Sequence, residues 1–210
     1  MRAPVLWTWD FFTGLGLDGL KLDLACGAAL AAAFLAAVPV LGRIVGLLTD
    51  TVMKGLSAAV GRRTAYWIAN YATFPGVVLH ELSHAAGAKL SGAKVESMRL
   101  FDPDGQSLGC VRFTCRGKRR RDMAFQRALA SCAPVIGGVL FILLFRAAAA
   151  WGRGYAPLEI LAWYSAFSMA CHMDMSGQDM KNYMKGCAWM FPYAAAVFLV
   201  FAYYIGHGAR

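Results

Sequence analysis

The sequence predicts a mostly α-helical, polytopic membrane protein with about five transmembrane helices and a small cytoplasmic β-hairpin between the second and the third. Composition is the first reason. Of 210 residues, 59% are hydrophobic and only 16% are charged, whereas soluble domains average about 25% charged residues. The mean hydropathy of +0.48 agrees with this. The second reason is that apolar residues gather in stretches long enough to cross about 30 Å of hydrocarbon.

Five stretches have the apolar character and length of a transmembrane helix, which needs about 20 residues. They are residues 24–42, 66–90, 128–151, 158–175 and 188–205. The segment before the first stretch carries Trp and Phe among Asp residues and is expected at the membrane interface. Residues 43–64 mix apolar and charged side chains, which fits either an amphipathic helix or a deep loop.

On this pattern the chain divides into three parts. Residues 1–64 hold the interfacial segment, the first transmembrane helix and the amphipathic connection. Residues 65–185 form a core with two functional helices and the hairpin, and residues 186–210 form the last transmembrane helix.

The charge distribution predicts the topology. The formal net charge is +9, and residues 89–127 hold ten of the 21 basic residues. The positive-inside rule therefore places this loop and the N-terminus in the cytoplasm of a multi-pass protein of the cell membrane. The basic residues are not interleaved with aromatic ones, so nucleic acid is not an expected partner. Of the six cysteines, four lie in or near the apolar stretches and are expected to be packing residues: Cys26, Cys132, Cys171 and Cys187. Cys110 and Cys115 lie in the basic loop without a second pair, so a zinc ribbon is not expected.

His80, Glu81 and His84 form an HExxH motif inside the second apolar stretch. Residues four apart lie one above the other on a helix, so both imidazoles can bind one Zn²⁺ at about 2.0–2.1 Å. Glu81 lies beside them, where a carboxylate can accept a proton from an activated water. Ionisable groups within a span are costly, which argues against a chance occurrence. The motif predicts a metalloprotease site with one Zn²⁺ per chain, His80 and His84 as ligands, and Glu81 as the catalytic residue.

The residues around the motif fit this chemistry. Pro75 removes a backbone hydrogen bond and Gly76 follows it, so the helix is expected to be interrupted there. A break at membrane depth requires protein or water to satisfy the freed groups. The small residues 85–88 allow another helix to approach closely and bring a third ligand near the metal.

A catalytic zinc usually has three protein ligands and one open position. Three candidates for the third ligand stand at or just after the end of the fourth stretch: His172, Asp174 and Asp179. A carboxylate in apolar surroundings needs a partner or a metal ion. Alternatively the stretch has ended and both carboxylates are solvated, and the residue pattern alone leaves this open.

Over about residues 66–185 the chain resembles the site-2 protease family of intramembrane zinc metalloproteases. The resemblance rests on HELSH at residues 80–84, on the preceding Pro75-Gly76 and on KLSGAKV at residues 89–95. It continues with SCAPVIGG at residues 131–138, which is similar to the small-residue and proline element of the family.

An Asp at the end of a later stretch completes the resemblance and implies that Asp179 is the third zinc ligand. In the family this Asp stands in a Leu-Asp-Gly element rich in Asn and Pro. Here Asp179 follows Gln178 and precedes Met180, without an Asn-Pro pair, so Asp174 and His172 stay as alternatives. The resemblance implies hydrolysis of peptide bonds of transmembrane protein substrates in or near the lipid bilayer. It also implies a compact member without a PDZ domain.

The hairpin is a candidate substrate-binding element. Residues 97–101 and 108–114 alternate as strands do, around a turn containing Pro and Gly at residues 102–105. A substrate helix must unwind before cleavage, and a strand edge can hold the unwound segment. The residues assigned to this role are Leu108, Gly109, Cys110 and Val111. A plain cytoplasmic hairpin explains the pattern equally well.

Two other function classes compete with the protease. A catalytically silent membrane scaffold or adaptor of the same fold has no need of Glu81, which is present. A membrane transporter with a His/Asp metal or proton site often has repeated halves, and the sequence shows no internal repeat.

Overall fold

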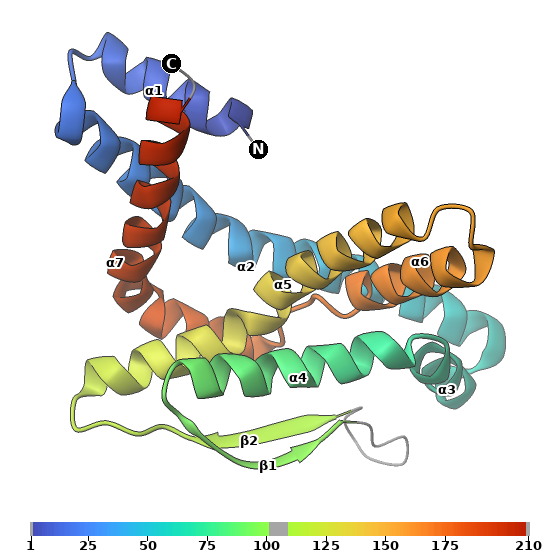
Figure 1. Cartoon of the computed structure of the whole chain (residues 1–210). Coiled ribbons are helices and arrows are strands. Elements are labelled where there is room, and N and C mark those ends of the chain that lie inside the picture. The colour runs from blue at the N-terminus through green and yellow to red at the C-terminus, as the bar shows by residue number, and fades with distance from the viewer. Residues whose placement is uncertain (1, 101–108, 209–210) are drawn as a thin grey trace. The chain divides into compact units, whose positions relative to one another are not determined.

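The computed structural model describes residues 2–100 and 109–208, as a succession of helices with one hairpin (Figure 1). The elements are α1 (Arg2–Gly14), α2 (Gly19–Val60), α3 (Arg62–Ala72), α4 (Phe74–Leu90), β1 (Lys94–Arg99), β2 (Cys110–Thr114), α5 (Arg120–Trp151), α6 (Ala156–Ala170) and α7 (Gly177–Gly208). They form two compact units. One comprises Met1–Ala37 with Cys187–Arg210, and the other comprises Val38–Gly186.

Among the described residues, three helices are long and apolar enough to cross a membrane, namely α2, α5 and the part of α7 that ends at Tyr204. A membrane protein is therefore supported, but five spans are not confirmed. The second predicted stretch covers the last part of α3 and the whole of α4, which has 17 residues, and the fourth falls on α6, which has 15. At about 1.5 Å per residue α4 and α6 are roughly 25 and 22 Å long, short of a typical hydrocarbon core.

The second predicted stretch is divided at Thr73, between α3 and α4. Thr73 has φ −121° and ψ 26°, outside the helical region, and it stands two residues before Pro75. Proline lacks the N–H that would continue the hydrogen-bond ladder, so α4 begins here as a separate helix with proline in its first turn. The interruption expected at Pro75-Gly76 therefore lies two residues earlier, at Thr73, and Pro75 and Gly76 themselves stand in the first turn of α4.

The smaller unit consists of α1, the first part of α2 and the last part of α7. Leu22, Cys26 and Ala202 are its buried core, and Trp9 and Phe12 pack against them. The N-terminal segment is thus helical and is held by an apolar contact.

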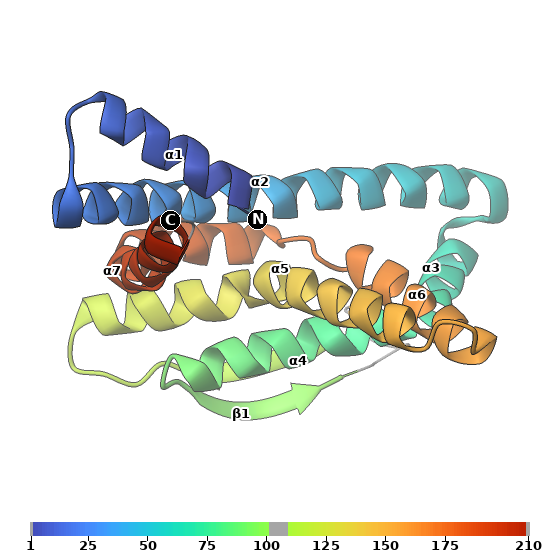
Figure 2. The same cartoon turned by 45° about the horizontal axis from the view of Figure 1, so that its top comes forward.

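In the larger unit, α4 lies between α5 and the hairpin in both views of the ribbon (Figures 1 and 2). Helix α5 also packs against α6. The close packing expected from residues 85–88 is confirmed, because a Cβ on Gly87 would lie 2.6 Å from Cβ of Ala133 and 2.9 Å from the Leu129 carbonyl oxygen. Small residues at this contact let the two backbones approach.

The residues 43–60 are helical and continue α2 without a break. Of the two alternatives for this region, the structure therefore has the helix. This part of α2 lies against the segment between α6 and α7, because a Cβ on Gly42 would lie 2.7 Å from Cγ of Met175. The Thr49 hydroxyl donates to the Cys171 carbonyl at 3.3 Å.

The hairpin is an antiparallel pair with a bulge between Val95 and Ser97. The first strand begins at Lys94, three residues before the predicted start, and the turn at residues 102–105 lies outside the described residues. The expected alternation along the second strand is confirmed. Val95 and Phe113 pack on the buried Ala88 and Ala130 of α4 and α5, while Cys110 and Arg112 are exposed.

The buried carboxamide of Gln126 holds the segment that connects β2 to α5. The backbone N–H of Arg116 donates to Oε1 of Gln126 at 2.8 Å, and Nε2 of Gln126 donates to the Arg116 carbonyl at 2.6 Å. Gln126 is thus satisfied in the interior, as burial of an amide requires.

Candidate active site

The three residues of the motif lie on α4 and their side chains converge. Nε2 of His80 and Nε2 of His84 are 3.1 Å apart, with the two rings nearly perpendicular at 77°. One helical turn of spacing places them on the same face, as the sequence predicts.

Backbone carbonyls fix the tautomer of both histidines. Nδ1 of His80 lies 2.5 Å from the His172 carbonyl oxygen, and Nδ1 of His84 lies 2.8 Å from the Ala130 carbonyl oxygen. A carbonyl oxygen only accepts, so each Nδ1 carries the hydrogen and each Nε2 presents a lone pair. Two lone pairs therefore face each other at 3.1 Å with no hydrogen between them.

A cation bound by both lone pairs would remove the repulsion between them, and the distance between the two nitrogen atoms fits a zinc ion. Two ligands of a tetrahedral zinc, each bound at about 2.0–2.1 Å, are roughly 3.3 Å apart. The observed separation of 3.1 Å is close to that value. Neutral imidazoles with Nδ1 held by an oxygen are also the usual zinc-binding form.

Of the three candidates for the third ligand, Asp179 lies near His84. Its Oδ2 is 3.9 Å from Nε2 of His84, which is within reach of a shared ion but not at bonding geometry. Ser176 holds it at the start of α7: the Ser176 hydroxyl donates to Asp179 Oδ2 at 2.5 Å and accepts the Asp179 backbone N–H at 3.1 Å. In the described ranges, no three His, Cys, Asp or Glu side chains are assembled as they stand into a metal-holding group.

The side chain of His172 forms a hydrogen bond with Thr73. Its Nε2 lies 2.7 Å from the Thr73 hydroxyl, which itself donates to the Ala69 carbonyl at 2.6 Å. The single hydroxyl hydrogen is used, so His172 Nε2–H donates to Thr73. The His172 carbonyl orients His80, and the side chain anchors the junction of α3 and α4. Asp174 lines the same cavity as His80.

Glu81 is buried, with 8% of its surface exposed, and lies against the residue that precedes β2. A Cβ on Gly109 would be 2.5 Å from Cγ, 2.8 Å from Cδ and 2.9 Å from Oε1 of Glu81. The absence of a side chain at Gly109 therefore leaves space for the carboxylate. Of the hairpin residues assigned to substrate binding, Gly109 touches the motif, Cys110 and Val111 follow it in β2, and Leu108 lies outside the described residues.

The motif opens onto a cavity of about 860 Å³ in the larger unit. Its wall is formed by residues of α2, α3, α4, Gly109 and the segment after α6, and both His80 and Glu81 line it. Asn70, on α3, also lines the cavity although only 6% of its surface is exposed. The HExxH motif thus faces a cavity whose wall is partly polar and partly apolar.

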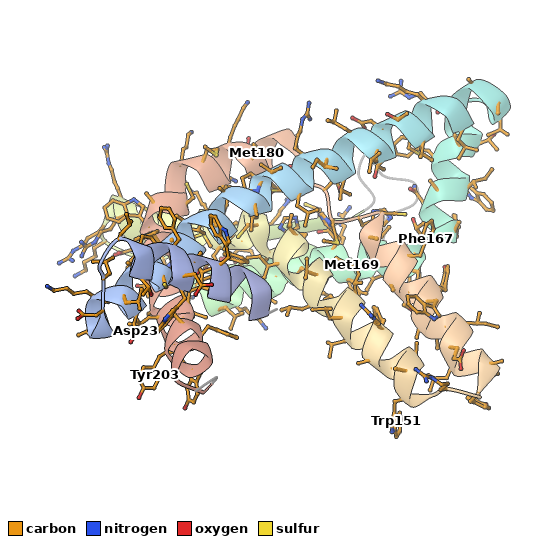
Figure 3. The ribbon with its side chains drawn as sticks, turned by 90° about the horizontal axis from the view of Figure 1, so that it is seen from above. Asp23, Trp151, Phe167, Met169, Met180 and Tyr203 are labelled. Carbon is orange, nitrogen blue, oxygen red and sulfur yellow. The ribbon has the colours of Figure 1, made fainter. Side chains whose placement is uncertain are left out.

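Ser168 of α6 satisfies the backbone groups freed by the break before α4. The Gly76 N–H donates to the Ser168 hydroxyl at 2.7 Å, and that hydroxyl donates to the Thr73 carbonyl at 2.8 Å. The requirement that protein satisfy the break is thus met. Met169, the next residue in α6, is fully buried in the larger unit, whereas Trp151 projects from the end of α5 (Figure 3).

The sequence reasoning missed Asn70, Ser168 and the role of Gln126. Asn70 had a readable signal, since it is the single carboxamide within the apolar residues 66–90. Ser168 and Gln126 had none, because their partners are 92 or 95 and ten residues away along the chain. The close approach of α5 was expected to bring a third ligand, but that helix brings the Ala130 carbonyl, which orients His84.

Comparison with known proteins does not assign the chain to a family. No family model matches it. No curated protein and no solved structure matches it either.

Proposed function

We propose that the chain is an intramembrane zinc metalloendopeptidase, a compact relative of the site-2 proteases, which hydrolyses peptide bonds of membrane-protein substrates within or near the bilayer. The observation that carries the proposal is the pair of Nε2 lone pairs on His80 and His84, 3.1 Å apart, each fixed by a carbonyl at Nδ1. Such a pair beside a buried glutamate is what a zinc-dependent hydrolase requires.

His80, His84 and Asp179 would hold the zinc ion, with Asp174 and His172 as alternatives to Asp179. Bound zinc supplies a Lewis acid, which polarises a carbonyl group and acidifies a water molecule. Glu81 accepts the proton of the attacking water and delivers it to the leaving amine. Its place at the cavity wall, against Gly109, lets the carboxylate reach the substrate from buried surroundings.

The proposed topology has five membrane-crossing segments, with α4 and α6 as the two short ones. The N-terminus and the basic loop at residues 89–127 are cytoplasmic, and the membrane is the cell membrane. Short helices lie at membrane depth when other helices and polar groups satisfy their ends. The bonds from Ser168 to Gly76 and Thr73 support this for α4.

The hairpin supplies the proposed binding surface for an unwound substrate. Gly109, which touches Glu81, is directly followed by β2, so a segment paired along Cys110 and Val111 would lead towards the catalytic carboxylate. Leu108 would continue this edge. Backbone pairing suits substrates of varied sequence, because main-chain groups are the same in all of them.

Zinc content of the purified full-length chain tests the proposal. Wild type is expected to bind about one zinc per chain, and His80→Ala, which deletes one of two lone pairs, is expected to lose it. Ser91→Ala is the matched control, because Ser91 lies past the end of α4 and its hydroxyl bonds only the Ala88 carbonyl. Equal zinc in wild type and His80→Ala contradicts the site. Zinc bound without any cleavage of membrane substrates points instead to a silent scaffold.

A further inference from the structure

Asn70 is a buried carboxamide that faces the catalytic cavity. It lies on α3, with 6% of its surface exposed, and it lines the same cavity as His80 and Glu81. The polar atoms of its side chain are not among those that are both fully buried and without a hydrogen-bond partner. They are therefore accessible from the cavity. In the part of the chain that the structure describes, no hydrogen bond to this side chain is present.

A carboxamide at a cavity wall that has no hydrogen-bond partner in the protein is free to pair with a ligand in that cavity. The other buried carboxamide of the larger unit shows how the chain satisfies such a group. Gln126 accepts the N–H and donates to the C=O of one residue, Arg116, at 2.8 and 2.6 Å. A carboxamide is suited to this, since it has one acceptor oxygen and two N–H donors side by side.

The geometry points to Asn70 as a backbone clamp for the substrate, pairing with a main-chain N–H and C=O in the cavity as Gln126 pairs with Arg116. This rests on the proposed function. The clamp selects for an extended peptide segment, because a helical segment uses its own N–H and C=O groups internally. Asn70 therefore holds the segment unwound beside Glu81 and recognises main-chain rather than side-chain chemistry.

Peptide binding tests the clamp apart from catalysis. The probe is a short fluorescein-labelled apolar peptide, and the protein is the full chain carrying Glu81→Gln so that the probe is not cleaved. Adding Asn70→Leu is expected to weaken binding by about tenfold, the effect of losing a buried hydrogen-bonded pair. Asn182→Leu is the matched control, because Asn182 bonds Gln178 on α7 and does not line the cavity.

N-methylation of the probe separates a direct contact from a change of fold. A methyl group on one peptide nitrogen at a time removes one donor. The parent protein is expected to lose about tenfold in affinity at one position of the probe, and Asn70→Leu is expected to lose nothing further at that position. Equal binding by parent and Asn70→Leu, or the same N-methyl penalty in both, overturns the clamp.

Kinetics in the active protein give a second readout. Asn70→Leu is expected to raise KM about tenfold with kcat nearly unchanged, because the clamp acts in substrate and transition state alike. A fall in kcat at unchanged KM overturns the clamp, since it assigns Asn70 to the transition state alone. Failure of the proposed function is distinct: it appears as absent zinc or absent cleavage in wild type, whereas the peptide measurements still report on Asn70.

Discussion

Gly109→Ala is expected to remove most catalytic activity while leaving the fold and the zinc site in place. The added Cβ would lie 2.5 Å from Cγ of Glu81, 2.8 Å from Cδ and 2.9 Å from Oε1. Carbon atoms in ordinary contact are about 3.5–4.0 Å apart, so the glutamate must move by roughly 1 Å. Gly109 does not have positive φ, so alanine strains no backbone torsion there, and the cost falls on Glu81.

A flexible side chain moves at modest cost in stability, on the order of 1–3 kcal/mol for overpacking. A catalytic group displaced by about 1 Å costs roughly 100-fold in rate. We therefore expect kcat/KM for a membrane-protein substrate to fall about 100-fold. The zinc content is expected to equal that of wild type, because neither His80 nor His84 is touched.

Cleavage assays of purified protein in detergent, together with metal analysis and thermal unfolding, measure these three quantities. Gly55→Ala is the matched control. It makes the same substitution inside α2, where an added Cβ meets no atom within 4 Å, and it is expected to stabilise the helix by about 0.5–1 kcal/mol. A folded, zinc-loaded Gly109→Ala protein with wild-type kcat/KM would refute the placement of Glu81 against β2.

Three further predictions concern the ligands, the base and the topology. Glu81→Gln is expected to abolish proteolysis with zinc still bound, since the proposed function assigns Glu81 to proton transfer and not to metal binding; cleavage by this variant contradicts that role. Asp179→Asn is expected to lower the zinc affinity, measured by chelator competition, at least about tenfold. Asp174→Asn and His172→Ala are expected to retain more metal. If only these two variants lose zinc, one of Asp174 and His172 is the third ligand and Asp179 is not. Cys110 is exposed on β2 and is expected to react with a membrane-impermeant maleimide only after cells are opened, with Cys110→Ser as the control. Ready labelling in sealed cells reverses the topology.

Features that depend on residues close together in the sequence were predictable, whereas features that depend on contacts between distant segments were not. The helical spacing of His80 and His84 is local, so the converging imidazoles were predictable from the motif. The strand alternation around Val111 was predictable for the same reason. The division of one apolar stretch into α3 and α4 was signalled by Pro75, but its consequence for span length depended on Thr73 leaving the helical region.

The position of Asp179 near His84 was not predictable from local pattern, because it depends on how α7 starts. Ser176 caps that helix and binds the carboxylate of Asp179, and this pairing brings Asp179 to 3.9 Å from His84. Asp174, five residues earlier, lies before the helix and lines the cavity instead. A capped helix start was readable in Ser-x-x-Asp, but its position beside α4 is a property of tertiary packing.

The tautomers of the two histidines are also set by packing, and two glycines make that packing possible. Gly76 stands four residues before His80 and Gly87 three residues after His84, so each lies on the same helical face as its histidine. A Cβ on Gly76 would collide with the Ser168 carbonyl and lie 2.8 Å from the His172 ring; one on Gly87 would lie 2.9 Å from the Leu129 carbonyl oxygen. The missing side chains therefore let the segments that carry the His172 and Ala130 carbonyls reach the two Nδ1 atoms. A motif of the same spacing without these glycines would still align two imidazoles, but nothing would fix their lone pairs towards a common ion.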